Sequence, residues 1–376
     1  MTVHDWDAGD RHASWLELFF DLVVVVAVSK LGDLLHHDPS PGGAATFVGL
    51  LVPVWWAWIS YSYFADLFDD DSAPHRLAQL AGMLGMIVLA VTLTGGVGRD
   101  GHVFALAYAA LFVLLTAMYA RVGATEPRAA ELCRWYTAGS ALGAGLWLVS
   151  AAVPAPGRYW LWAVALVANA AISGPVAYAR MQSQPAQVSH MSERFGLFTI
   201  VVLGETVLSV VAGIDTTDWR AASTVAAVAG FVIGAAIWWV YFGAFDEETI
   251  SRAIAGGRST QVRAFVYGYG HLVIYAAIVA VGVGVEIAIE HAASGADAPG
   301  LLGWAVAALV GGFFLISVGS RWAAVPAILV AKLGLAVGAV VACAVGLPAA
   351  AATSLIAVGW AALVATEVRL GIPGPS

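Results

Sequence analysis

The sequence predicts an all-α polytopic membrane protein with about twelve transmembrane helices, arranged as two parallel six-helix repeats. Three observations support this fold class. Of the 376 residues, 60% are hydrophobic and 11% are charged, and the mean hydropathy is +0.83. A soluble core of ordinary shape cannot bury that much apolar surface. Apolar stretches of membrane length recur along the chain, and one acidic-aromatic motif occurs twice.

The expected helices follow from the length of these stretches. A helix needs about 20 residues to cross a hydrocarbon layer of about 30 Å. The expected spans are 14–36, 44–64, 76–96, 101–121, 131–153, 159–178, 193–213, 221–244, 263–287, 299–319, 325–345 and 349–368. The acidic residues before the first span have the wrong sign for a secretory signal, so we expect this span to remain in the mature protein.

The repeat rests on two pairs of matched segments. The first pair opens two spans 176 positions apart: Glu17-Leu18-Phe19-Phe20-Asp21 and Glu193-Arg194-Phe195-Gly196-Leu197. The second pair closes two spans 177 positions apart: Tyr61, Phe64, Phe68, Asp69 and Asp70, and Trp238, Tyr241, Phe245, Asp246 and Glu247. Six spans per copy is an even number, so the copies enter the membrane with the same orientation. We therefore predict a first repeat at 1–178, a linker at 179–192 and a second repeat at 193–376, the alternative being chance similarity between two low-complexity halves.

Charge indicates the orientation and excludes some partners. Of the 17 Lys and Arg residues, twelve fall at the termini or in even-numbered loops and three in odd-numbered loops. The positive-inside rule then predicts that both termini lie in the cytoplasm. No basic run supports nucleic-acid binding. The expected partners are the lipid bilayer, a small ion or solute, and a second copy of the chain.

Several of these segments resemble the bacterial low temperature requirement protein A family (LtrA). The resemblance covers about a fifth of the chain: Glu17-Leu18-Phe19-Phe20-Asp21-Leu22-Val23, Trp55-Trp56-Ala57-Trp58-Ile59 with Phe68-Asp69-Asp70, and Glu193-Arg194-Phe195-Gly196-Leu197-Phe198-Thr199-Ile200-Val201-Val202-Leu203-Gly204-Glu205. It implies a polytopic inner-membrane protein whose molecular activity is poorly defined. This chain departs from the family pattern at Lys30, where a neutral polar residue such as glutamine is expected.

A weaker similarity concerns the mechanism. The segment Phe19-Phe20-Asp21, preceded by a glutamate and followed by Val and Ala, is similar to the Phe-Ser-Asp signature of TMEM175-type potassium channels, which are also built from six-span units. This chain lacks the serine, and its second copy has Leu197 where the aspartate would stand. The similarity implies an ion pathway by analogy with that fold.

The first candidate residues are the carboxylates that open the repeats. Glu17 and Asp21 are four residues apart and therefore share one face of a helix. In low dielectric, two such carboxylates should hold a proton more tightly or recruit a cation. The alternative is that both lie in the headgroup layer, near the positive end of the helix dipole. Glu193 and Arg194 open the second copy and are candidates for the same ion or substrate pathway.

Three further candidates lie deeper in the expected spans. Glu205 stands twelve residues into its span, about 18 Å along the helix and near the middle of the bilayer, where an unpaired charge is costly. Its repeat equivalent is Ser29, so we predict that the adjacent Lys30 pairs with Glu205 across the repeat axis. His271 and Glu286 are fifteen residues apart on a roughly shared helix face. His271 is a candidate proton relay, or else a hydrogen-bonded structural histidine.

Two acidic clusters close the second and eighth spans. Their weak metal candidates, Asp69, Asp70, Asp246 and Glu247, could hold a divalent cation through oxygen ligands, or could pair with nearby arginines to fix the helix ends. The sequence contains no phosphate-binding loop, no Gly-x-Ser-x-Gly elbow and no His-Glu-x-x-His pair, so no catalytic residue and no cofactor are expected.

Together these features favour a secondary transporter or an ion-conducting protein, moving protons or other cations, over an enzyme. Two alternatives stay open. One is a membrane-embedded enzyme that uses the acidic clusters and Mg²⁺ on a lipid-like substrate. The other is a non-catalytic envelope or cold-stress protein.

Overall fold

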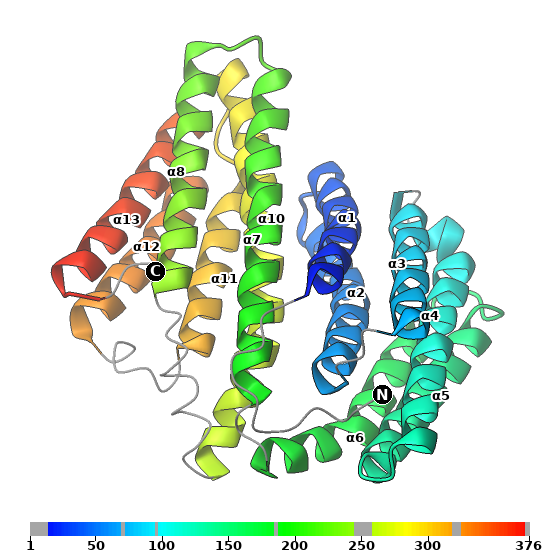
Figure 1. The fold of residues 1–376 in the computed structure, drawn as a ribbon. Coiled ribbons are helices and arrows are strands. Elements are labelled where there is room, and N and C mark those ends of the chain that lie inside the picture. Colours follow the sequence, from blue (N-terminus) through cyan, green and yellow to red (C-terminus); the bar gives the residue numbers. More distant parts are fainter. Residues whose placement is uncertain are drawn as a thin grey trace. The chain divides into compact units, whose positions relative to one another are not determined.

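The chain forms an all-helical structure. The structure is a computed structural model that describes residues 14–68, 72–94, 97–183, 187–243, 258–317 and 325–372. Within these ranges there are twelve α-helices (Figure 1), and the only β-type pairing is an isolated bridge between Asp297 and Pro348. The helices are α1 (Trp15–His37), α2 (Pro41–Leu67), α3 (Ala73–Thr94), α4 (Val97–Thr125), α5 (Ala130–Ser150), α6 (Gly157–Ser183), α7 (Gln187–Asp215), α8 (Ala221–Gly243), α10 (Arg258–Ser294), α11 (Gly300–Ile316), α12 (Pro326–Ala344) and α13 (Ala349–Arg369).

Each of these twelve helices of the described residues overlaps one of the expected spans, so the all-helical prediction is confirmed. Eight of them are long and apolar enough to cross a membrane: α2, α3, α4, α7, α8, α10, α12 and α13. Among the other four, α11 is apolar but has only 17 residues. Helix α1 carries four charged side chains: Glu17, Asp21, Lys30 and Asp33. Charged side chains are costly along a helix of membrane length, so these four residues are candidates for a functional site.

The chain divides into two compact units. Unit 1 contains the described parts of Met1–Leu34 and Gly49–Arg194, and unit 2 those of Leu35–Val48 and Phe195–Ser376. Helices α1, α2 and α7 therefore each contribute residues to both units. The predicted division into two sequence repeats with a linker at 179–192 stays a prediction.

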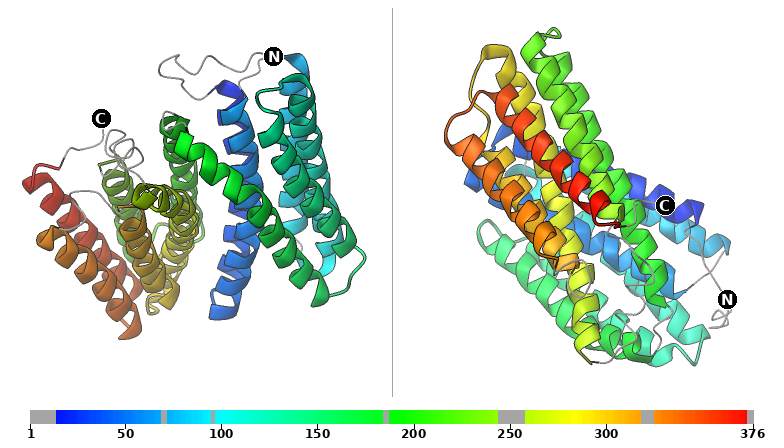
Figure 2. Two further views of the ribbon diagram at one scale, coloured as in Figure 1. Left: turned by 90° about the horizontal axis from the view of Figure 1, so that it is seen from below. Right: turned by 90° about the vertical axis from the view of Figure 1, so that its left-hand side faces the viewer.

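Unit 1 is built around a stack of aromatic rings. Helices α3, α4, α5 and α6 pack side by side in chain order (Figures 1 and 2). The ring of Trp147 on α5 stacks on Tyr108 of α4, with centroids 4.0 Å apart, and on Trp162 of α6, with centroids 4.9 Å apart. All three side chains are buried. Large rings bury more apolar surface than other side chains, so this stack joins three helices at one point.

Unit 2 is held together by close helix contacts at small residues. Helices α10, α11, α12 and α13 pack in chain order, and α8 packs on α10 and α13 (Figure 2). Gly303 of α11 lies so close to α12 that a Cβ atom there would be 2.8 Å from the carbonyl oxygen of Ala339. A Cβ atom at Gly230 of α8 would also collide with the side chain of Val285 on α10. Small residues let membrane helices approach closely, which is where most of their packing energy arises.

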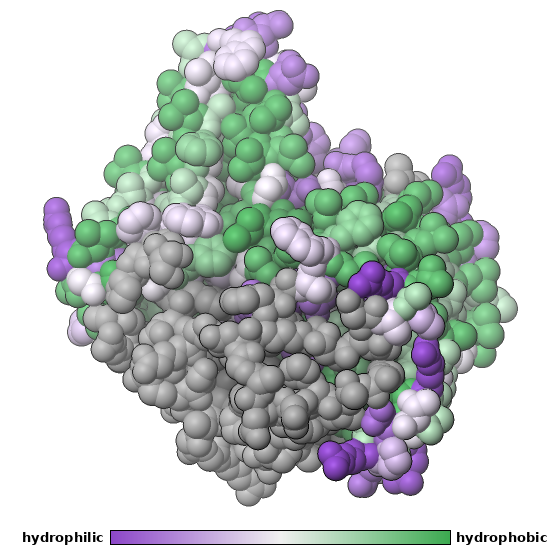
Figure 3. Space-filling model, viewed as in Figure 1, coloured by the Kyte–Doolittle hydropathy of each residue, from purple (hydrophilic) through white to green (hydrophobic). Residues whose placement is uncertain are grey.

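Large apolar side chains cover the outer faces of the helices. On α7 and α8, these exposed residues are Val207, Leu208, Val211, Val225, Val228 and Phe231. Figure 3 shows mostly apolar residues along the helices in view and polar residues where α7 and α8 connect. Lipid tails are as apolar as these side chains, so their exposure is the expected surface of a membrane protein.

Candidate functional site

Hydrogen bonds at the first turn of α1 position the first carboxylate of the site. The backbone N–H of Ser14 donates to Oε2 of Glu17 over 2.7 Å, and the backbone N–H of Glu17 donates to Oγ of Ser14 over 3.3 Å. This reciprocal pair is a capping box, which satisfies amide groups that a helix start leaves without partners. It also fixes the Glu17 carboxylate at the first turn of α1.

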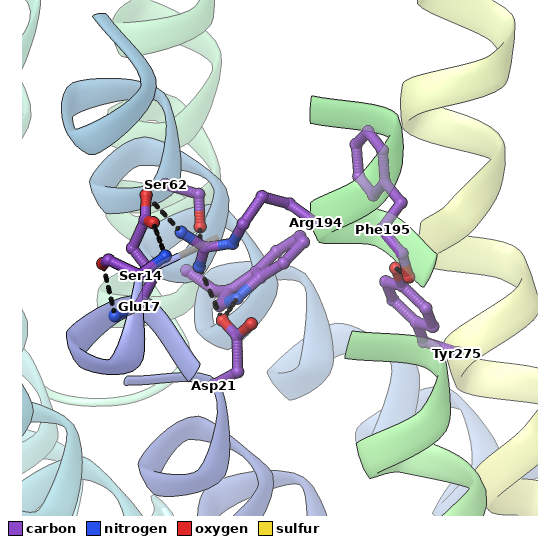
Figure 4. A network of polar contacts seen from close by, with 8 residues as sticks. Ser14, Glu17, Asp21, Ser62, Arg194, Phe195 and Tyr275 are labelled. Atoms are coloured by element: carbon purple, nitrogen blue, oxygen red, sulfur yellow. Dashed lines mark hydrogen bonds and ion pairs between the residues drawn. The ribbon is translucent and has the colours of Figure 1, made fainter. Parts of the chain in front are cut away.

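Arg194 of α7 joins the two carboxylates of α1. Its Nη1 atom lies 3.0 Å from Oε1 of Glu17, and its Nη2 atom lies 2.7 Å from Oδ1 of Asp21. The same Nη2 donates to Oγ of Ser62 on α2 over 3.2 Å (Figure 4). A guanidinium presents several N–H groups in a rigid plane, so it can serve two carboxylates at once.

A tryptophan of α2 also donates a hydrogen bond to Asp21. Nε1 of Trp58, on α2, donates to Oδ1 of Asp21 over 2.7 Å, so that this oxygen accepts from both Trp58 and Arg194. We call the six residues Ser14, Glu17, Asp21, Trp58, Ser62 and Arg194 the Arg194 cluster. All six belong to unit 1, and they come from the start of α1, the second half of α2 and the first half of α7.

The Arg194 cluster is buried. The exposed fraction is 0% for Asp21, 1% for Arg194 and 6% for Glu17. In the cluster, one guanidinium faces two carboxylates. Among the described residues, Oδ2 of Asp21 and Nε of Arg194 are buried and have no hydrogen-bond partner. Since a buried polar atom without a partner is costly in low dielectric, Oδ2 of Asp21 can take up one proton or contact one small cation.

Sequence reasoning identified the charged members of the cluster and missed the others. The four-residue spacing of Glu17 and Asp21 places both carboxylates within reach of one guanidinium, and Arg194 was a candidate without an assigned partner. Ser14 could have been found, because Ser-x-x-Glu before an apolar run is the capping-box pattern. For Trp58 and Ser62, no spacing in the sequence indicates that they point toward Asp21.

The predicted pair of Lys30 and Glu205 is not part of this cluster. Nζ of Lys30 lies 2.8 Å from Oδ2 of Asp33, one turn further along α1. Lys30 belongs to unit 1 and Glu205 to unit 2, so their pairing stays a prediction. Glu205 is half-buried on α7, and Glu193 is half-buried next to Arg194.

His271 lies in a separate, aromatic cluster of unit 2. Its Nδ1 atom is 2.7 Å from the carbonyl oxygen of Tyr267, and its Nε2 atom is 2.8 Å from the hydroxyl of Tyr241. A carbonyl oxygen can only accept, so Nδ1 carries a proton, and in the neutral ring Nε2 accepts from Tyr241. The ring of Phe195 stacks on His271 with centroids 4.4 Å apart, and the carbonyl of Phe195 accepts from the Tyr275 hydroxyl over 3.0 Å (Figure 4 for the latter pair). Both ring nitrogens of His271 are thus engaged by this cluster.

Glu286 lies elsewhere on α10, about 22 Å further along the helix axis from His271. Its neighbours are Glu290, one turn further along α10, and His36, near the end of α1. The predicted metal candidates, Asp69, Asp70, Asp246 and Glu247, lie outside the described residues.

Comparison with known proteins shows the family of the chain. Residues 12–368 match the family described as bacterial low temperature requirement A protein (LtrA). The uncharacterized protein RA0937 of Rhizobium meliloti (strain 1021) is 30% identical, over 82% of this chain and 76% of its own length. No solved structure matches the chain. Since the family match spans nearly the whole sequence, including the Glu17–Asp21 and Glu193–Glu205 segments, this helical membrane protein belongs to the bacterial low temperature requirement A protein family.

Proposed function

We propose that the protein is a secondary transporter or ion-conducting protein that moves protons or small cations, and that the Arg194 cluster is a binding step on their path. The observation that carries this proposal is the burial of Asp21 and Arg194 together, at 0% and 1% exposure. Ionisable residues inside membrane segments are rare and costly, and by default they mark ion pathways or proton relays.

The carboxylate of Asp21 selects the kind of ion. A carboxylate oxygen accepts a proton or contacts a small cation, and it repels an anion. The buried Oδ2 of Asp21 offers a lone pair that no described residue uses. A single proton on that oxygen needs no rearrangement of the Arg194 and Trp58 contacts on Oδ1.

The competing explanation is a purely structural ion pair that joins α1, α2 and α7. The substitution Asp21→Asn separates the two explanations. Asparagine keeps the size of the side chain and an oxygen that accepts from Trp58 and Arg194, but it cannot take up and release a proton. A structural pair therefore tolerates this change in a flux assay, whereas a proton-binding step does not.

The test uses the full chain reconstituted in liposomes that contain a pH-sensitive dye, with imposed H⁺, K⁺ or Na⁺ gradients. We expect flux with the unsubstituted protein, and with Asp21→Asn flux no faster than in protein-free liposomes. The matched control is Asp33→Asn, because Asp33 is on the same helix but exposed, and this variant should retain flux. If the folded, unsubstituted protein moves none of the three ions, or if Asp21→Asn conducts normally, the proposal is wrong.

We also propose that the chain lies in the bacterial cytoplasmic membrane with both termini in the cytoplasm. The excess of Lys and Arg at the termini and even-numbered loops supports this orientation. Single cysteines at Thr125, in the α4 to α5 connection, and at Thr216, in the α7 to α8 connection, test it. In intact spheroplasts, a membrane-impermeant maleimide should label Thr216→Cys and not Thr125→Cys, and the reverse pattern would overturn the orientation. Native Cys133 and Cys343 are buried.

The two-repeat arrangement belongs to the same proposal. In unit 1, helices α3 to α6 pack in chain order, and in unit 2 helices α10 to α13 do so as well. This common succession supports two copies of one six-helix plan. The copies have diverged at the site, since Asp21 of the first corresponds to Leu197 of the second and Arg194 of the second to Leu18 of the first.

A further inference from the structure

A second cluster of ionisable side chains lies in unit 2, and the proposed ion path does not use it. Glu286 and Glu290 are four residues apart on α10, so their carboxylates lie on one face of the helix, one turn apart. His36, in the last turn of α1, points its Nε2 atom at both of them, 3.7 Å from Oε1 of Glu286 and 3.4 Å from Oε2 of Glu290. One ligand atom from each residue lies within 4.8 Å of the other two.

We propose that His36, Glu286 and Glu290 bind a divalent transition-metal ion, with Zn²⁺ as the representative. One imidazole nitrogen and two carboxylate oxygens are ligands that Zn²⁺, Mn²⁺ and Fe²⁺ accept in proteins. Three protein ligands leave at least one coordination position for water or for another molecule. The site is distinct from the Arg194 cluster, which lies in unit 1.

The distances fit a shared ion better than a direct ion pair. A charged hydrogen bond between an imidazolium and a carboxylate is about 2.7–2.9 Å long, and both distances here are longer. Ligands about 2.0–2.1 Å from one tetrahedral ion stand about 3.3 Å from each other, which is close to the 3.7 Å and 3.4 Å between Nε2 of His36 and the two carboxylates. Among the described residues, Nε2 of His36 is buried and has no hydrogen-bond partner. A metal ion would supply the missing partner for this lone pair.

Burial and position also suit a binding site. The exposed fraction of the side chains is 27% for His36, 20% for Glu286 and 32% for Glu290, so the ligands are shielded but remain accessible. His36 and Glu290 both lie within a few residues of the carboxyl end of their helix. In the orientation proposed above, both ends emerge on the side opposite the cytoplasm, so the ion would enter from outside the cell.

The first experiment measures the metal content of the full chain, purified in detergent with a tag that contains no histidine. The protein is stripped with EDTA, exposed to a slight excess of Zn²⁺ in 10 mM Mg²⁺, and separated from free metal before elemental analysis. We expect one Zn²⁺ per chain that Mg²⁺ does not displace. Zn²⁺ well below one per chain, or Zn²⁺ that Mg²⁺ removes, would overturn the proposal, because either result describes an ordinary acidic patch.

Variants then assign the ligands. His36→Asn and Glu290→Gln keep the shape and polarity of each side chain, and both should weaken Zn²⁺ binding at least about 100-fold, since even changes behind the ligands commonly weaken it 10–100-fold. The matched control is His102→Asn, which removes an exposed histidine of α4 and should leave binding unchanged. Retention of tight binding by His36→Asn and Glu290→Gln would show that the ion is bound elsewhere. Gel-filtration profiles and helix content by circular dichroism should match between all variants, so a loss of binding cannot be mistaken for unfolding.

Discussion

Nη2 of Arg194 lies 2.7 Å from Oδ1 of Asp21, between two side chains that are almost fully buried and 173 residues apart in sequence. The contact joins the start of α7 to the first turns of α1. Removing one partner of a buried pair is more damaging than removing both, because the remaining charge loses its compensation. That asymmetry gives the first prediction.

Arg194→Gln should lower the free energy of unfolding by about 3–5 kcal/mol, because the buried carboxylates of Asp21 and Glu17 then lose their contacts with the guanidinium. Adding Asp21→Asn and Glu17→Gln to the same chain should restore most of this loss. The free energy of unfolding of Arg194→Lys should lie between those of the unsubstituted protein and Arg194→Gln. A lysine is a point charge that cannot serve two carboxylates in the same geometry. Unfolding by SDS titration in mixed micelles measures all four proteins. A triple variant less stable than Arg194→Gln would contradict the account of the cluster.

The capping box predicts a smaller effect at Ser14. Ser14→Ala should destabilise the protein by about 0.5–2 kcal/mol, because the amide of Glu17 loses its acceptor, and Ser14→Gly by only a few tenths. Glu17→Gln should keep the cap, since glutamine also accepts from the amide of Ser14, but it should lose the attraction to Arg194. The same SDS titration measures the stability of these variants. Equal effects of Ser14→Ala and Ser14→Gly would argue against the capping role.

Two glycines of α11 provide a matched test of helix packing. A Cβ atom at Gly303 would lie 2.8 Å from the backbone oxygen of Ala339, whereas one at Gly311 would meet nothing within 4 Å. Gly303→Ala should therefore destabilise the protein by about 1–3 kcal/mol through overpacking. Gly311→Ala should be neutral or slightly stabilising, because alanine favours helix. Thermal unfolding in detergent compares the two, and equal Tm values would mean that α11 and α12 do not approach closely.

The aromatic stack of unit 1 predicts a large effect at Trp147. Trp147→Ala should cost about 3–5 kcal/mol, because the cavity cannot be filled by the rings of Tyr108 and Trp162 that flank it. Trp160→Ala is the control, since Trp160 is 73% exposed, and it should change stability by about 0.5 kcal/mol or less. Thermal unfolding followed by tryptophan fluorescence and by circular dichroism separates a local loss of structure around the stack from unfolding of the whole protein. Similar losses for the two variants would be inconsistent with the stack.

Much of the fold could be predicted because its determinants are local. Apolar length alone indicated where each helix lies, and the twelve expected spans each correspond to a helix. Glu17 and Asp21 could be recognised as neighbours because they are one turn apart on the same helix. Charged residues in apolar helices could be recognised as candidates because a membrane makes them costly wherever they face.

The partners of these residues could not be predicted, because they depend on which helices pack together and at what rotation. Lys30 contacts Asp33 on its own helix, and its pairing with Glu205 across the repeat axis stays a prediction. The cation that serves Glu17 and Asp21 is Arg194, and His36 meets Glu286 and Glu290 from a helix some 250 residues away in the chain. By itself the sequence determined a helical membrane protein with scarce, costly charges, because hydropathy acts over about 20 neighbouring residues. Only the tertiary structure decided which of those charges meet, because close helix packing brings distant residues within a few ångströms.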